Sequence, residues 1–170
     1  MTVRLVGLDG VSLKMESGSS VGLIYGLEFQ CRSLCSVAAD TDNVSFLVGT
    51  QGLKLPNQIH HIQLREDTQT LTKNIYQHSC GEIWEIASSY SDPSLFSTRH
   101  SQVDGGGLKV GGSVWRMSQD KSPDRYISGV GQELELICHL RSENGRDEAE
   151  HISWLPSPES SKWPLQSYLN

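Results

Sequence analysis

The sequence is poor in cysteine and in basic residues, and these two shortages exclude several classes of protein. Its 170 residues include four cysteines, and 14 lysines and arginines stand against 20 aspartates and glutamates, which gives a net charge of −6. A small secreted scaffold held by disulfides needs more cysteines in a shorter chain, so we expect reduced thiols. The basic residues are scattered, and an acidic chain repels a phosphate backbone, so nucleic acid is not an expected partner.

Long apolar runs are also missing. No window of the sequence approaches the roughly 18 apolar residues of a membrane span. The start of the chain does not form the apolar core of a signal peptide, because Asp9 and three glycine or arginine positions interrupt it. We therefore expect a cytoplasmic chain with no direct membrane insertion, whose presence at any membrane depends on a partner. Residues 1–22 are rich in glycine and serine and are expected to be a flexible leader or a weak edge strand, and Met15 resembles a natural start.

From residue 23 onward, short apolar segments are separated by turn-rich polar connectors, and this pattern predicts an all-β fold. Residues 23–34 alternate with period two, which predicts one half-buried strand. Further expected strands lie at 44–50, 58–64, 71–76, 94–98, 112–117 and 133–140. The glycines from Gly105 to Gly112 are expected to form a long connection between two of these strands.

The segment that begins at His78 has the order of a WD-type propeller repeat. A turn with a histidine is followed by a strand, by a strand with serine or threonine, and by a strand that ends in a tryptophan. In such a blade, these three polar side chains can hydrogen-bond across the sheet and satisfy buried groups that would otherwise cost about 1–3 kcal/mol each. By position, we assign His78, Ser97 and Trp115 to this set. The simpler alternative is that His78 is only a turn residue.

Other patterns in the sequence offer chemistry but lack the necessary context. Ser20 lies in a Gly-x-Ser-x-Gly pattern, yet no buried strand precedes this serine and no helix follows it, so a flexible linker is the better interpretation. Zinc-compatible side chains occur at Cys31 and Cys35, at His60 and His61, and at His78 and Cys80 without a familiar finger spacing. We therefore expect no metal, no cofactor and no enzyme. A serine hydrolase that uses Ser20 is the alternative of another class.

Several segments in order along the chain resemble one family, the WD-repeat proteins that interact with the EARP and GARP tethering complexes. The matching segments include 24–30 (IYGLEFQ), 46–51 (FLVGTQ), 57–60 (NQIH), 81–84 (GEIW), 114–117 (VWRM), 134–136 (LEL) and 138–140 (CHL). Together they cover about residues 23–156. Two positions depart from a typical repeat, since Arg116 stands where aspartate is usual and His60 stands where tryptophan is usual.

The resemblance implies a WD40-type β-propeller with seven blades, more than twice the length of this chain. It implies a non-enzymatic adaptor, peripherally recruited to the trans-Golgi network and endosomes, with subunits of EARP and GARP as partners in endosome-to-Golgi retrograde transport and endosomal recycling. A WD-repeat substrate adaptor in protein ubiquitination is the alternative. In this frame the chain is expected to be a truncated or alternatively spliced N-terminal fragment of about two and a half blades. Its expected parts are blade 1 at about 23–77, blade 2 at about 78–140, the start of blade 3 at about 148–156, and a divergent tail at 157–170.

Overall fold

The computed structural model describes residues 11–13, 23–52, 56–104, 107–118, 131–140 and 150–156. Within these ranges the chain forms β-strands and no helix, so the prediction of an all-β fold is confirmed. None of the described residues belongs to a helix that could cross a membrane. The strands are β1 (Val11–Leu13), β2 (Leu23–Tyr25), β3 (Cys31–Ser36), β4 (Val44–Thr50), β5 (Asn57–Arg65), β6 (Thr70–His78), β7 (Glu82–Ser88), β8 (Leu95–Asp104), β9 (Gly107–Met117) and β10 (Gln132–Leu140).

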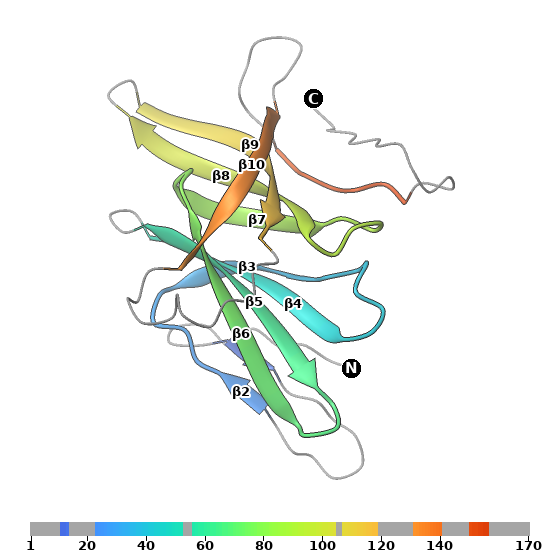
Figure 1. Cartoon of the computed structure of the whole chain (residues 1–170). Coiled ribbons are helices and arrows are strands. Elements are labelled where there is room, and N and C mark those ends of the chain that lie inside the picture. The colour runs from blue at the N-terminus through green and yellow to red at the C-terminus, as the bar shows by residue number, and fades with distance from the viewer. Residues whose placement is uncertain are drawn as a thin grey trace.

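Eight of these strands form one curled sheet with the order β3-β4-β5-β6-β10-β9-β8-β7 (Figure 1). It consists of two antiparallel meanders, β3–β6 and β7–β10, which we call the first and the second meander. Their outer strands meet in a short parallel pair, in which Gln132 lies opposite Tyr76 and Glu133 opposite Gln77. The first and the last strand of the sheet order, β3 and β7, also pack beside each other.

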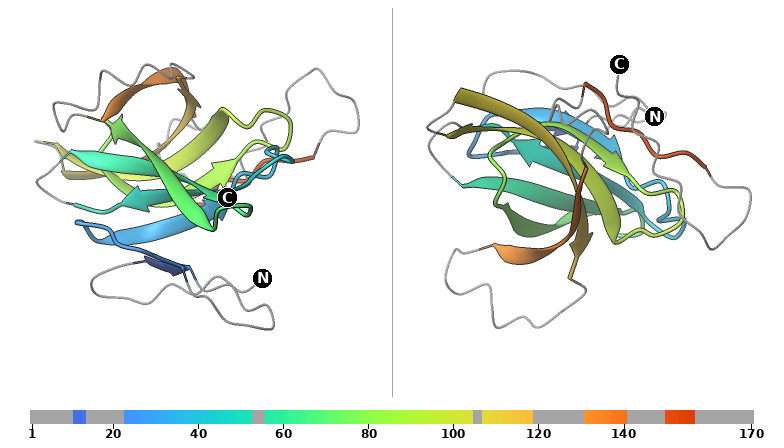
Figure 2. Two further views of the ribbon diagram at one scale, coloured as in Figure 1. Left: turned by 60° about the horizontal axis from the view of Figure 1, so that its bottom comes forward. Right: turned by 90° about the horizontal axis from the view of Figure 1, so that it is seen from above.

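The main core lies between the two meanders, and Figure 2 shows their strands layered beside one another. Both meanders contribute to this first cluster, whose buried members are Val37, Leu47, Ile59, Tyr76, Ile83, Ile86, Phe96, Trp115 and Met117. The two meanders approach closely at Gly49, because a Cβ there would lie 2.6 Å from a methyl group of Ile83 and 2.9 Å from one of Ile86. Burial of this apolar surface is the largest favourable contribution to joining the meanders.

The two outer faces are covered by smaller clusters. On the first meander Phe46, Val48 and Ile62 pack with Tyr25, the last residue of β2, which pairs with β1. On the second meander, a third cluster consists of Leu95, Val114 and Trp154. β4 is buried on both faces, because alternate side chains enter the first and the second cluster. The described chain is therefore a series of layers with apolar contacts between them.

The registers of the two meanders correspond. Phe46 of β4 lies opposite Ile62 of β5, as Phe96 of β8 lies opposite Trp115 of β9. The structure thus contains a repeat of four strands. The number of propeller blades stays a prediction.

Two predicted segments differ from the structure. Residues 23–34 are not one strand, since β2 pairs with β1 and β3 pairs with β4, with a bend between them. The alternating pattern arises because Tyr25 and Leu27 both pack on the second cluster. It indicates which side chains are buried and does not require one continuous strand. Gly111 and Gly112 are not in a connection but inside β9, opposite His100 and Arg99.

Several predicted features lie partly or wholly outside the described residues. Of the predicted leader, the structure describes Val11–Leu13, which form an edge strand. Met15, Ser20 and the predicted tail at 157–170 are outside the described ranges.

Candidate functional site

A histidine at the end of the first meander joins a threonine and a tryptophan of the second meander in one polar cluster. His78 is the last residue of β6 and only 2% exposed, and its Nε2 lies 3.0 Å from Thr98 Oγ1. Trp115 Nε1 donates to the same oxygen over 2.8 Å. Because an indole nitrogen can only donate, the Thr98 oxygen is the acceptor for Trp115, and the same hydroxyl is also the hydrogen-bond partner of His78 Nε2. His78 and Trp115 are therefore brought together, with Thr98 between them.

The predicted third member, Ser97, points the other way. Its Oγ accepts a hydrogen bond from Trp154 Nε1 at 3.0 Å and donates to the carbonyl of Ala87 at 3.4 Å. Successive residues of a strand face opposite sides, and Phe96 lies opposite Trp115, so Thr98 and not Ser97 shares the face of the tryptophan. When Phe96 is placed opposite Trp115, Thr98 lies two positions further along the strand and therefore on the same face as the tryptophan. This pairing is the signal in the sequence that could have identified Thr98.

In the first meander the corresponding positions are mostly apolar. The register places Ile62, not His60, at the position of Trp115, and Val48 at the position of Thr98. Tyr25 packs on both side chains, and its hydroxyl lies 2.8 Å from His60 Nδ1. The sequence pattern predicts His60 at the tryptophan position of this meander, and the ladder register corrects that position to Ile62.

Burial keeps the imidazoles of this region neutral at pH 7. It lowers the pKa of His78 to about 3, with a further contribution from His100. Burial also lowers the pKa of His100 to about 4, assisted by His139, and that of His60 to about 4, assisted by Lys73. The buried Ser113 hydroxyl lies 2.9 Å from His100 Nε2 and 2.9 Å from Nδ1 of the exposed His139. The buried imidazoles of His78, His100 and His60 are therefore neutral side chains of the interior.

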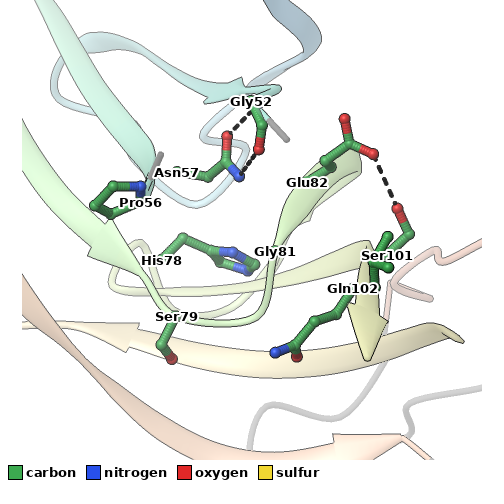
Figure 3. Close-up of a pocket in the computed structure, with 10 residues that line it drawn as sticks. Gly52, Pro56, Asn57, His78, Ser79, Gly81, Glu82, Ser101 and Gln102 are labelled. Carbon is green, nitrogen blue, oxygen red and sulfur yellow. Dashed lines mark hydrogen bonds between the residues drawn. The ribbon is translucent and has the colours of Figure 1, made fainter. Parts of the chain in front are cut away.

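A cavity of about 320 Å³ lies next to His78, at the end of the sheet where β4 turns into β5 and β6 turns into β7 (Figure 3). The turn after β6 is sharp, since Gly81 has φ +82 and a Cβ there would clash with the carbonyl of Ser101. Glu82 lines the cavity and accepts a hydrogen bond of 3.3 Å from Ser101 Oγ, drawn in Figure 3. Sequence reasoning missed this cavity, because its wall comes from separate segments of the chain.

The residues proposed as zinc-compatible do not form a ligand set in the described part of the chain, where no group of three or more His, Cys, Asp and Glu could hold a metal ion. Cys31 packs on the second cluster, and Cys35 and Cys80 pack on the first. Burial raises the pKa of Cys35 to about 12 and also raises those of Cys31 and Cys80, so these thiols stay protonated at neutral pH. They serve as small core side chains.

Replacing Thr98 by valine is expected to lower the free energy of unfolding by about 2–4 kcal/mol, because His78 Nε2 and the indole of Trp115 both lose their partner while buried. The matched change Ser97→Ala is expected to cost about 1 kcal/mol or less, since Trp154 keeps the carbonyl of Ala87 at 3.0 Å. Urea unfolding followed by circular dichroism measures both. Equal losses for the two variants would contradict the assignment of Thr98 to the central position.

Comparison with known proteins finds relatives of this chain. An "EARP-interacting protein homolog" from Gekko japonicus is 38% identical over 146 residues, which cover 82% of this chain and 37% of the relative. The "EARP and GARP complex-interacting protein 1" of Homo sapiens is 41% identical over 124 residues, 69% of this chain and 32% of the relative. The "WD repeat-containing protein DWA2" of Arabidopsis thaliana is 34% identical over 149 residues, 87% of this chain and 39% of the relative.

The chain thus spans between about 32% and 39% of the length of these curated relatives. No protein-family model matches the sequence, and no solved structure matches it.

Proposed function

Because the chain belongs to the family of the EARP and GARP complex-interacting proteins, we propose that it is a non-enzymatic WD-repeat adaptor for subunits of these tethering complexes. Its place would be the cytoplasm, with peripheral recruitment to the trans-Golgi network and endosomes. Its role there would be in endosome-to-Golgi retrograde transport and endosomal recycling. The names of the relatives support the choice of partner.

The observation that carries the adaptor proposal is the repeated stacking of one unit on the next. Ser88 Oγ, at the end of β7, donates a hydrogen bond of 2.7 Å to the carbonyl of Ser36 at the end of β3. In the same way Trp154 Nε1 donates a hydrogen bond of 3.0 Å to the carbonyl of Ala87, near the end of β7. Residues 150–156 thus lie on the second meander much as β7 lies on the first. This arrangement supports the interpretation of the meanders as successive propeller blades and of residues 150–156 as the start of a third.

Propeller blades offer loops and edges for binding and need no catalytic group of their own. The interior supports this interpretation, since His78, Thr98 and Trp115 are all buried and bonded to one another. Their arrangement stabilises a blade, and it leaves no nucleophile of this set accessible to a substrate.

The proposal is tested by affinity purification of the tagged chain from cytosol, beside a tagged full-length relative and the tag alone, with partners identified by mass spectrometry. Recovery of EARP or GARP subunits with the chain and with the relative, but not with the tag, is the expected result. Recovery of cullin adaptors without tethering-complex subunits would favour ubiquitination instead. Labelling by a fluorophosphonate probe that is lost in Ser20→Ala would contradict the non-enzymatic part.

A further inference from the structure

The cavity next to His78 contains a carboxylate without a cation. Glu82 lines this cavity and forms no ion pair in the described part of the chain, where the bridges join Arg116 to Glu135 and His151 to Glu85. None of the described lining residues is a lysine or an arginine. Because burial keeps His78 uncharged at neutral pH, Glu82 is the charged group among the described lining residues. A cation is therefore attracted to this part of the wall.

A relay of two hydrogen bonds ends at one oxygen of this carboxylate. Trp84 Nε1 donates to Ser101 Oγ over 2.6 Å, and Ser101 Oγ donates to Glu82 Oε2 over 3.3 Å. The Trp84 ring is itself fixed under the guanidinium of Arg32, whose central carbon lies 4.2 Å from the ring centre. Only Oε2 of Glu82 is engaged by this relay. The other oxygen can accept from a ligand without any loss of an existing bond, and a fixed acceptor binds with less loss of side-chain entropy.

The other polar groups of the cavity fall into two kinds. The Asn57 side chain is already used, since its amide bonds both the nitrogen and the carbonyl of Gly52, as Figure 3 shows. The side chains of Ser79 and Gln102 are exposed and also lie in the wall. Their oxygens are acceptors that suit an ammonium or guanidinium group.

An exposed apolar pair adjoins the cavity. Val103 is 67% exposed and lines the cavity, and its partner in the ladder, Leu108, is 62% exposed. Both lie near the tip of the β8–β9 hairpin, which projects at the upper left of Figure 1. Exposed apolar side chains next to a polar cavity are typical of a surface that binds another protein.

We propose that this cavity receives a lysine or arginine side chain of a protein partner, and that an apolar residue beside that side chain packs on Val103 and Leu108. The proposal specifies a contact site for the adaptor function proposed above and rests on it. The negative charge of Glu82 favours a basic residue in the cavity. The exposed side chains of Val103 and Leu108 near the hairpin tip favour an apolar residue beside it.

The test is a titration of the isotope-labelled chain with the peptide acetyl-Gly-Leu-Arg-Leu-Gly-amide, followed by NMR at the indole N–H of Trp84. This proton belongs to the relay that ends at Glu82 and should shift saturably, while that of Trp115 stays in place. The same peptide with norleucine instead of arginine should bind about tenfold more weakly or not at all, which corresponds to the loss of about 1.4 kcal/mol or more. Glu82→Gln should weaken binding of the arginine peptide about tenfold.

Glu66→Gln is the matched control, because Glu66 is an exposed glutamate in the turn between β5 and β6 and does not line this cavity. It should bind the peptide like the unmodified chain. Val103→Ser should weaken binding of the peptide several-fold. Equal affinity of Glu82→Gln and the unmodified chain, or of the norleucine and arginine peptides, would overturn the proposal.

The cavity and the adaptor function can fail separately. If the chain captures tethering-complex subunits while Glu82→Gln retains full peptide binding, the cavity proposal is overturned and the adaptor function stands. If peptide binding depends on Glu82 but no tethering-complex subunit is captured, the cavity is supported and the adaptor function is overturned.

Discussion

Lowering the pH from 7.5 to 5 is expected to destabilise the fold strongly, because three buried imidazoles must stay neutral in it. The pKa is about 3 for His78 and about 4 for His60 and His100 in the folded chain, against 6.5 for an exposed histidine. As the pH falls below about 6.5, the unfolded chain takes up protons that the folded chain cannot. The stability contributed by these groups is therefore fully present above pH 6.5 and is lost progressively from there, down to about pH 4 for His60 and His100 and about pH 3 for His78. Three such groups give a slope of up to about 4 kcal/mol per pH unit.

Urea unfolding at pH 7.5, 6.5, 5.8 and 5 measures this slope. His100→Gln should reduce it by the equivalent of about one proton. A free energy of unfolding that is the same at pH 7.5 and 5 would contradict the neutral interior.

Replacing Trp115 by alanine is expected to lower the free energy of unfolding by about 3–5 kcal/mol. The Trp115 ring is 2% exposed and belongs to the core between the meanders. Its loss therefore leaves a cavity in the buried interface between the two meanders. The hydroxyl of Thr98 also loses its donor. Trp115→Phe keeps most of the ring and should cost less.

The matched control for Trp115→Ala is Leu108→Ala, which removes a side chain that is 62% exposed and should change the stability by about 0.5 kcal/mol or less. Urea unfolding at pH 7.5, followed by circular dichroism, compares the three variants with the unmodified chain. Equal effects of Trp115→Ala and Leu108→Ala would show that the tryptophan does not hold the meanders together.

Local patterns in the sequence predict the strands well and their contacts less well. The strand predicted at 44–50 coincides with β4, because its β-branched and aromatic residues are flanked by turn residues. The order of His78 and Trp115 identifies two members of the polar set, but the serine or threonine between them depends on which face a residue takes. Choosing Ser97 over Thr98 is a difference of one position, and in a strand one position reverses the direction of the side chain.

Features made by distant segments are not visible in any local pattern. The cavity beside His78 combines residues near 52–57, 78–82 and 101–103, and none of these segments has a distinctive motif. The bond from Trp154 to Ser97 likewise depends on how residues 150–156 return to the second meander. Gly111 and Gly112 resemble a loop in the sequence, yet β9 accommodates them because His100 packs against one and Leu140 against the other.

The parallel pair between β6 and β10 has a consequence for the order in which the chain folds. Every other ladder of the curled sheet joins neighbouring strands of one meander, so it closes a short loop, whereas this pair joins Tyr76 to Gln132 across the whole second meander. Closing the longer loop costs more chain entropy, so this pair is the least favourable one to form early. We expect the hairpins to form before the rate-limiting step and the β6–β10 pair after it. Changes at that pair should then speed unfolding and leave the folding rate unchanged in stopped-flow experiments, and an equal slowing of folding would contradict this order.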